Sequence, residues 1–139
     1  MSLITPEVRA SAEILTENEV CKEKIKTLLK EYCLPDGLLP VENVEEFGYV
    51  KETGFTWIKQ KCEIKHKYEK ISKQVSFANE ITFYFENCKM KKLTGVKAKE
   101  LLIWIPCNEI HTESQTSDKV TFKTPTGLSK TFPKDAFVA

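Results

Sequence analysis

The spacing of apolar residues changes at residues 34–40, LPDGLLP, and this change constrains the fold more than any other feature of the chain. Before this motif, apolar side chains recur every three or four residues, as on one face of an amphipathic helix: Cys21, Ile25, Leu28, Leu29 and Tyr32. After it, they alternate with polar residues, as in β-strands. The proline, aspartate and glycine of the motif favour a turn. The sequence therefore predicts a helical segment over about residues 6–33 and a β segment over about residues 41–133.

Two helix starts are visible in the first part of the chain. The tripeptide Thr5-Pro6-Glu7 places a capping hydroxyl before a proline that suits the first helical position. Thr16 and Glu19 have the spacing of a capping box. We therefore expect one helix to begin after Thr5 and a second, amphipathic helix to begin after Thr16.

The β segment contains one strictly alternating stretch and one that is apolar on both faces. Residues 62–69, CEIKHKYE, place Cys62, Ile64, His66 and Tyr68 on one face of a strand. The LLIWI run that starts at residue 101 predicts a central strand covered on both sides. Close turn signals divide the segment into about seven to nine short strands. We predict a mainly β fold with N-terminal α-helices (α+β): an antiparallel, strongly bent sheet or β-barrel-like single domain over residues 1–139, covered or plugged by the amphipathic helix.

Charge is close to balanced overall but unevenly distributed. The net charge is +1, which argues against a dedicated nucleic-acid-binding protein. Residues 57–100, however, carry 11 lysines and 5 glutamates, a net charge of +6. Lysine is a hydrated point charge and is poor at bidentate reading of phosphates or bases. Solvated strand surfaces account for such a segment, and a patch for anionic lipid or an acidic partner remains the alternative.

The location predicted for the protein is the cytoplasm. The N-terminal residues lack a basic region followed by an apolar core, so no secretory signal is expected. No stretch approaches the roughly 18–20 apolar residues of a transmembrane segment. The five cysteines form an odd number without regular spacing, which favours reduced thiols over a disulfide framework.

The two histidines are each preceded by a cysteine four residues earlier, at Cys62 and His66 and at Cys107 and His111. Residues i and i+4 of a strand lie about 13 Å apart, too far to chelate one zinc ion. The chain also lacks a nucleophile elbow, a P-loop and a G-x-G-x-x-G motif. We therefore predict no catalytic residue, no metal and no cofactor. His66, on the apolar face of its strand, has a structural role or a role in a binding or catalytic cavity, or is simply exposed at the end of the strand.

Aromatic residues supply the remaining candidates for a binding site. Trp57, Phe83, Phe85, Trp104 and Phe122 are expected to fill the interior. A barrel of about eight strands is either filled by side chains or holds one small ligand. The candidate ligand-binding residues are Trp57, His66, Tyr68, Phe83 and Trp104.

Several motifs, in order and spacing, resemble the plant domain of unknown function 538 family. They are LLKEYCLPDGLLP (28–40), ETGF (52–55), CEIKHKYEKI (62–71), LTGVKAKELLIWIP (93–106) and VTFKTPTGLSKTFPKDAF (120–137). The resemblance runs from about residue 6 to residue 137. It implies a plant protein with a β-barrel-like fold and a helical N-terminal part. A distant likeness to bactericidal/permeability-increasing, lipid-binding proteins and an ester hydrolase activity have been suggested for the family, and no agreed catalytic residues come with it.

Three classes of function are compatible with these observations. The first, which we favour, is non-enzymatic binding of a hydrophobic or lipid-like small molecule in a plant cell; it requires a cavity of ligand size. The second is a protein-interaction or regulatory module without a small-molecule site, which predicts an exposed apolar or single-sign patch. The third is an ester hydrolase, which requires a histidine within about 3 Å of a nucleophile.

Overall fold

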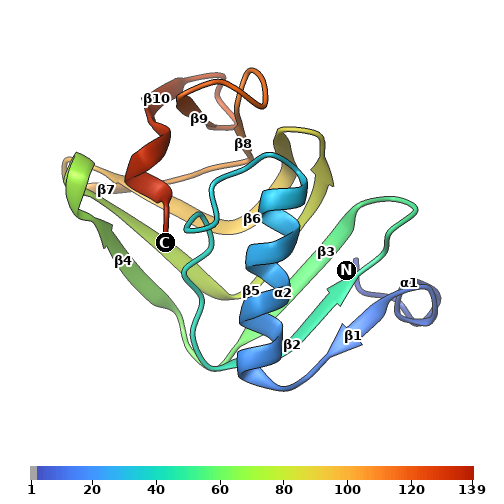
Figure 1. Ribbon diagram of the computed structural model, residues 1–139. Coiled ribbons are helices and arrows are strands. Elements are labelled where there is room, and N and C mark those ends of the chain that lie inside the picture. Colours follow the sequence, from blue (N-terminus) through green and yellow to red (C-terminus); the bar gives the residue numbers. More distant parts are fainter. Residues whose placement is uncertain (1–2) are drawn as a thin grey trace.

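The computed structural model of the chain describes residues 3–139, and these form one antiparallel sheet with short helices (Figure 1). The elements, in chain order, are α1 (Pro6–Ala10), β1 (Glu13–Leu15), α2 (Asn18–Glu31), β2 (Val44–Tyr49), β3 (Phe55–Gln60), β4 (Ile64–Tyr68), the 3-10 helix η1 (Glu69–Ile71), β5 (Lys73–Glu86), β6 (Lys89–Glu100), β7 (Ile103–Pro106), β8 (Glu109–His111), β9 (Lys119–Lys123), β10 (Ser129–Pro133) and the 3-10 helix η2 (Lys134–Phe137). The prediction of a mainly β, antiparallel fold with N-terminal helices is confirmed.

The long hairpin of β5 and β6 is the centre of the sheet. On one side β5 pairs with β4 over residues 73–77 and with β3 over residues 80–84. On the other side β6 pairs with β7 near its end and with β8 near its start. The main strand order is β1-β2-β3-β5-β6-β8-β9-β10, so that β1 and β10 are the two edges.

The sheet is open, so the barrel-like alternative of the predicted fold is wrong. Closure would require hydrogen bonds between the edge strands β1 and β10, and in the described sheet β1 pairs with β2 and β10 with β9. The physical reason lies in the central hairpin. Its register shifts between Phe77 and Thr82, and each end of it has its own pair of flanking strands. One end of the hairpin therefore pairs with β4 and β7 and the other end with β3 and β8, so the strands do not follow one another around a ring.

The two helices begin close to the predicted residues. The Thr5 side chain accepts a hydrogen bond from the backbone N–H of Val8 at 3.2 Å, which confirms the predicted cap of α1. For α2 the predicted cap is wrong by one residue, since Glu17 and not Thr16 is the capping residue. The Glu17 carboxylate accepts hydrogen bonds from the N–H groups of Glu19 and Val20, so one side chain satisfies two free donors.

The predicted apolar face of α2 is confirmed. Its buried side chains belong to the main core cluster together with residues of the sheet: Cys21, Ile25, Leu28 and Leu29. Tyr32, at the end of the helix, stacks on Phe85 of β5 with 4.5 Å between the ring centroids. Each fully buried leucine contributes about 1.5–3 kcal/mol to folding. This burial stabilises α2 more than its intrinsic propensity does.

A second, smaller core lies on the other face of the sheet, since Trp57 alternates with the main-core residue Ile58 along β3. It contains Val50, Phe55 and Trp57, against which residues of the N-terminal segment pack. The Trp57 Nε1–H donates to the Glu46 carboxylate at 2.8 Å, and Arg9 of α1 pairs with the same carboxylate. These interactions hold the pKa of Glu46 below its usual value. The short helix α1 therefore covers a tryptophan.

The prediction of a central strand at residues 101–105 is wrong. Leu101 and Leu102 are the two-residue turn between β6 and β7, because Glu100 pairs with Ile103. They are 93% and 90% exposed, and β7 pairs with β6 only, off the main strand order of the sheet. Trp104 is half-exposed and does not fill the interior as expected. Periodicity could not reveal this, because a short apolar run reads the same in a buried strand and in an exposed turn.

The cysteines differ in exposure: Cys62 is exposed and Cys107 is buried. Burial raises the pKa of the Cys107 thiol to about 11. An unfolded chain loses this proton near pH 8.5–9, while the folded protein keeps it. Above that pH the unfolded state binds fewer protons, so the stability contributed by Cys107 falls as the pH rises.

We expect the free energy of unfolding to fall by about 2–3 kcal/mol more in the wild type than in Cys107→Ala between pH 8 and pH 11. Urea unfolding at a series of pH values measures this difference. Cys62→Ala is the matched control and should follow the wild type. If the free energy of unfolding changes with pH in the same way in the wild type and in Cys107→Ala, the pKa of the Cys107 thiol is not raised by folding.

Candidate functional site

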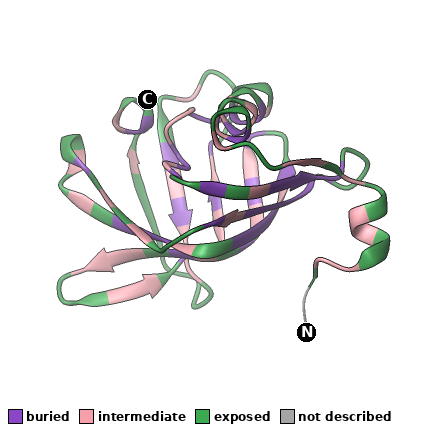
Figure 2. Ribbon diagram, turned by 90° about the horizontal axis from the view of Figure 1, so that it is seen from below, coloured by how far each residue is buried: buried purple, intermediate pink, exposed green. Residues whose placement is uncertain are grey.

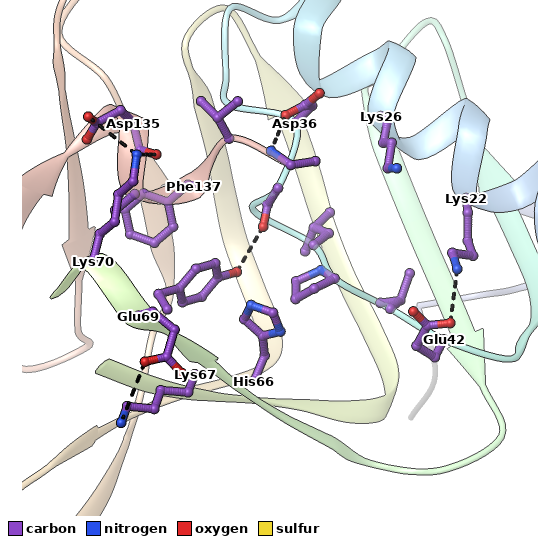
Figure 3. Close-up of a pocket in the computed structure, with 18 residues that line it drawn as sticks. Lys22, Lys26, Asp36, Glu42, His66, Lys67, Glu69, Lys70, Asp135 and Phe137 are labelled. Atoms are coloured by element: carbon purple, nitrogen blue, oxygen red, sulfur yellow. Dashed lines mark hydrogen bonds and ion pairs between the residues drawn. The ribbon is translucent and has the colours of Figure 1, made fainter. Parts of the chain in front are cut away.

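A cleft with a volume of about 710 Å³ lies beside the main core (Figure 3). Four segments that are distant in sequence line it: α2, residues 36–42, the end of β4 with η1, and residues 135–139. Its volume lies within the range of roughly 300–1,000 Å³ that is common for small-molecule sites. This cleft is the candidate functional site.

Tyr68, the last residue of β4, joins the sheet to the turn at residues 34–40. Its hydroxyl donates to the backbone carbonyls of Gly37 at 3.0 Å and Leu38 at 3.3 Å. Burial raises the pKa of Tyr68, so the phenol stays protonated and remains a donor. These hydrogen bonds fix the end of β4 relative to the turn at residues 34–40, and both segments line the cleft.

Gly37 and Asp36 bind the C-terminal segment to the same turn. The Gly37 N–H donates to the Phe137 carbonyl at 2.7 Å, and an Asp36 Oδ1 accepts from the Ala139 N–H at 2.8 Å. A Cβ atom on residue 37 would lie 2.4 Å from the Phe137 carbonyl oxygen. A glycine is therefore required for this approach of two backbones. The motif turns the chain from helix to sheet, as predicted, and it also builds two walls of the cleft.

The floor of the cleft is apolar. Its buried members are Leu39, Val41, Tyr68 and Phe137. The rings of Tyr68 and Phe137 lie 4.7 Å apart, and the ring of His66 meets Tyr68 edge-on at 4.6 Å. An apolar group entering the cleft would be in contact with these side chains.

The rim of the cleft is charged, and most of its charges are paired. Lys22 pairs with Glu42 at 2.9 Å, and Lys70 lies 3.7 Å from Asp135. Lys26 points from α2 toward the cleft in Figure 3 and is half-buried. Among residues 3–139 its ammonium group has no hydrogen-bond acceptor or carboxylate partner. Lys26 is therefore the cation of the rim that is available to an anion.

The structure brings together two of the five candidate binding residues. His66 and Tyr68 lie in the cleft, as expected from their shared strand face. Trp57 is in the second core, Phe83 is in the main core, and Trp104 lies on β7; none of these three lines the cleft. The floor and the lysines of the rim were missed because they come from segments that only tertiary packing brings together.

The two Cys–His pairs do not form a metal site in the part of the chain that the structure describes, where no group of three potential ligands is close enough to hold an ion. His111 lies in a different, polar cleft of about 530 Å³. Its Nδ1 is 2.7 Å from a Glu109 carboxylate oxygen, and its Nε2 is 3.5 Å from Glu113. Within the described residues, neither histidine contacts a hydroxyl or thiol nucleophile through a ring nitrogen.

None of the helices over residues 3–139 combines the length and the apolar character that crossing a membrane requires.

An open antiparallel sheet, a packed amphipathic helix and a cleft of ligand size define a small mainly β protein with a candidate binding site. The chain belongs to the family described as "Protein of unknown function, DUF538", whose model matches residues 25–138. The match begins inside α2, so α1 and β1 lie outside it. Comparison with curated proteins and comparison with solved structures give no match. The predicted family resemblance is confirmed, and plant origin stays a prediction.

Proposed function

We propose that the protein binds an amphipathic, lipid-like small molecule that carries an anionic group, and that the binding site is the cleft between α2 and the C-terminal segment. The observation that supports this most strongly is the combination of an apolar floor with the half-buried, unpaired cation of Lys26. A carboxylate, sulfate or phosphate group is the complement of the cation, and an alkyl or ring system is the complement of the floor.

The charge of Lys26 supplies the polar part of the recognition. The half-buried side chain of Lys26 carries an ammonium group that has no anionic partner among the described residues. A ligand anion would restore the missing interaction through a charge-assisted hydrogen bond, which is worth more than a neutral one. Lys22 lies on the same side of α2 and could share the anion if its pair with Glu42 opened.

The floor supplies the apolar part of the recognition. Transfer of one methylene group from water to an apolar surface contributes about 0.8 kcal/mol. Short alkyl chains in contact with Leu39, Val41 and Phe137 would therefore add several kcal/mol. In this proposal α2 borders the cleft on one side.

Isothermal titration with dodecyl phosphate, kept below its micelle concentration, tests the proposal. We expect Lys26→Gln to weaken binding about tenfold or more, because a charge-assisted hydrogen bond contributes about 1.5–3 kcal/mol. Lys24→Gln is the matched control: Lys24 lies on the same helix and is equally half-buried, but it pairs with Glu13 outside the cleft. It should bind within twofold of the wild type.

Dodecyltrimethylammonium serves as the ligand control, because it has the same chain with the opposite charge. The proposal requires that it bind much more weakly than the phosphate. Equal affinity for the two amphiphiles, or equal affinity of wild type and Lys26→Gln for the phosphate, would contradict it. We do not extend the proposal to ester hydrolysis, because the ring nitrogens of His66 and His111 meet no nucleophile among the described residues.

A further inference from the structure

The tip of the β6–β7 hairpin exposes three consecutive apolar residues. Leu101 and Leu102 are 93% and 90% exposed, and Ile103 is 66% exposed. In Figure 2 the tip is the green loop at the lower left, where two strands coloured mostly pink meet. Large side chains exposed singly are common on proteins, but three in succession at a projecting tip require an explanation.

The backbone at this tip is strained. Leu101 has a φ of 55°, in the left-handed region that disfavours side chains such as leucine. A two-residue turn in which only the first residue has a positive φ most often has glycine at that position, because glycine adopts positive φ without that cost. Leucine is thus a poor residue for the turn and a poor residue for contact with water. The exposure of these side chains is explained if the leucines enter an apolar medium.

The outward face of the adjoining strands is basic. Paired residues of an antiparallel sheet share a face, so the pairs of Ser76 with Lys65 and with Lys97 put both lysines on one side. Lys99 and its pair Trp104 lie two residues further on the same side. The ammonium groups of Lys65 and Lys99 are 5.6 Å and 5.7 Å from the Trp104 ring. This is the face opposite to the one that contributes Val75, Phe77 and Val96 to the main core.

The charges of this face are mostly free to meet anions. Among residues 3–139, Lys65, Lys97 and Lys99 have no carboxylate partner. The nearest acidic residue along the hairpin, Glu100, is paired with both Lys73 and Lys130, which hold its pKa below the usual value. The face therefore presents three unpaired cations, one interfacial tryptophan and an apolar tip.

We propose that this surface docks on an anionic lipid bilayer. Leu101 and Leu102 enter the edge of the hydrocarbon region, Trp104 lies at the level of the headgroups, and Lys65, Lys97 and Lys99 contact lipid phosphates. A bilayer fits better than an acidic protein because the apolar residues form a projecting tip that needs a penetrable medium. Lysine, as a point charge, also suits mobile headgroups that require no fixed bidentate geometry.

The test is co-sedimentation with vesicles of phosphatidylcholine alone or with about 30% phosphatidylserine. Wild type should bind the anionic vesicles at least tenfold more tightly than the neutral ones, and salt should weaken this binding. The double variant Leu101→Gly with Leu102→Asn places glycine at the residue with the positive φ, so it should fold at least as well as wild type. It should nevertheless bind anionic vesicles at least tenfold more weakly. Leu128→Ser, at a 68% exposed leucine of the β9–β10 turn, should leave binding unchanged.

Two further results separate this proposal from that for the cleft. Lys97→Gln with Lys99→Gln should weaken vesicle binding at least tenfold, whereas Lys26→Gln should not change it. The fluorescence of Trp104 should shift to the blue on binding and be quenched by brominated lipid, while buried Trp57 contributes a constant background. Equal vesicle binding by wild type and the variant with Leu101→Gly and Leu102→Asn would overturn the proposal. Failure of the wild type to bind either kind of vesicle would also overturn it and would make an acidic protein the next partner to test.

Discussion

Replacing Gly48 with alanine is expected to lower the free energy of unfolding by about 3 kcal/mol, which corresponds to a fall in melting temperature of about 10 °C. Gly48 on β2 pairs directly with Trp57 on β3. A Cβ atom at residue 48 would lie 2.1 Å from the nearest atom of the Trp57 ring. The ring cannot yield easily, because it is fully buried and hydrogen-bonded to Glu46, with Arg9 above it. Urea and thermal unfolding measure the change.

A double-mutant cycle isolates this clash from the general effect of adding a methyl group. In a Trp57→Leu background the ring atoms that would meet the new Cβ are absent, so Gly48→Ala should cost less than about 1 kcal/mol there. If the substitution costs the same in both backgrounds, the loss of stability does not come from a clash with the Trp57 ring.

Gly37→Ala is expected to destabilise the protein by about 2–3 kcal/mol and to weaken ligand binding at the cleft at least tenfold. The added Cβ would meet the Phe137 carbonyl oxygen, a backbone atom that cannot rotate away. Separation of the two segments would break the Gly37–Phe137 hydrogen bond and expose Phe137, which is otherwise buried. Urea unfolding, titration with dodecyl phosphate and hydrogen exchange of the residue 37 amide measure the three consequences.

Gly127→Ala is the matched control for this substitution. A Cβ at residue 127 meets no atom within 4 Å, so its cost is limited to backbone strain at a φ of 88°, about 1 kcal/mol. Binding at the cleft should be unchanged in this variant. A wild-type affinity in Gly37→Ala would show that the C-terminal segment is not a wall of the binding site.

Local patterns in the sequence were enough to predict part of the fold. The apolar face of α2 is buried and Thr5 caps α1, as the sequence indicated. The alternation in residues 62–69 placed His66 and Tyr68 on the face of β4 that borders the cleft. These predictions succeed because each depends on residues close together in the chain.

The remaining features depend on contacts that no local pattern contains. Whether the sheet closes is decided by how β5 and β6 share their flanking strands, and the sequence does not encode that division locally. The run at residues 101–105 has the composition of a core strand, but pairing of Glu100 with Ile103 turns two of its leucines outward. The cleft is lined by Lys26, Leu39 and Phe137, which are distant in the chain. The sequence pattern therefore revealed only the lining residues of β4, His66 and Tyr68.

The most direct test of the central claim is to map amide chemical shifts by NMR while dodecyl phosphate is added below its micelle concentration. The proposed site predicts saturable shifts that are largest around Lys26, Gly37, Val41, Tyr68 and Phe137, and that are lost in Lys26→Gln but kept in Lys24→Gln. Shifts confined to the β6–β7 tip, or shifts that do not reach these cleft residues at saturation, would contradict a ligand-binding cleft between α2 and the C-terminal segment.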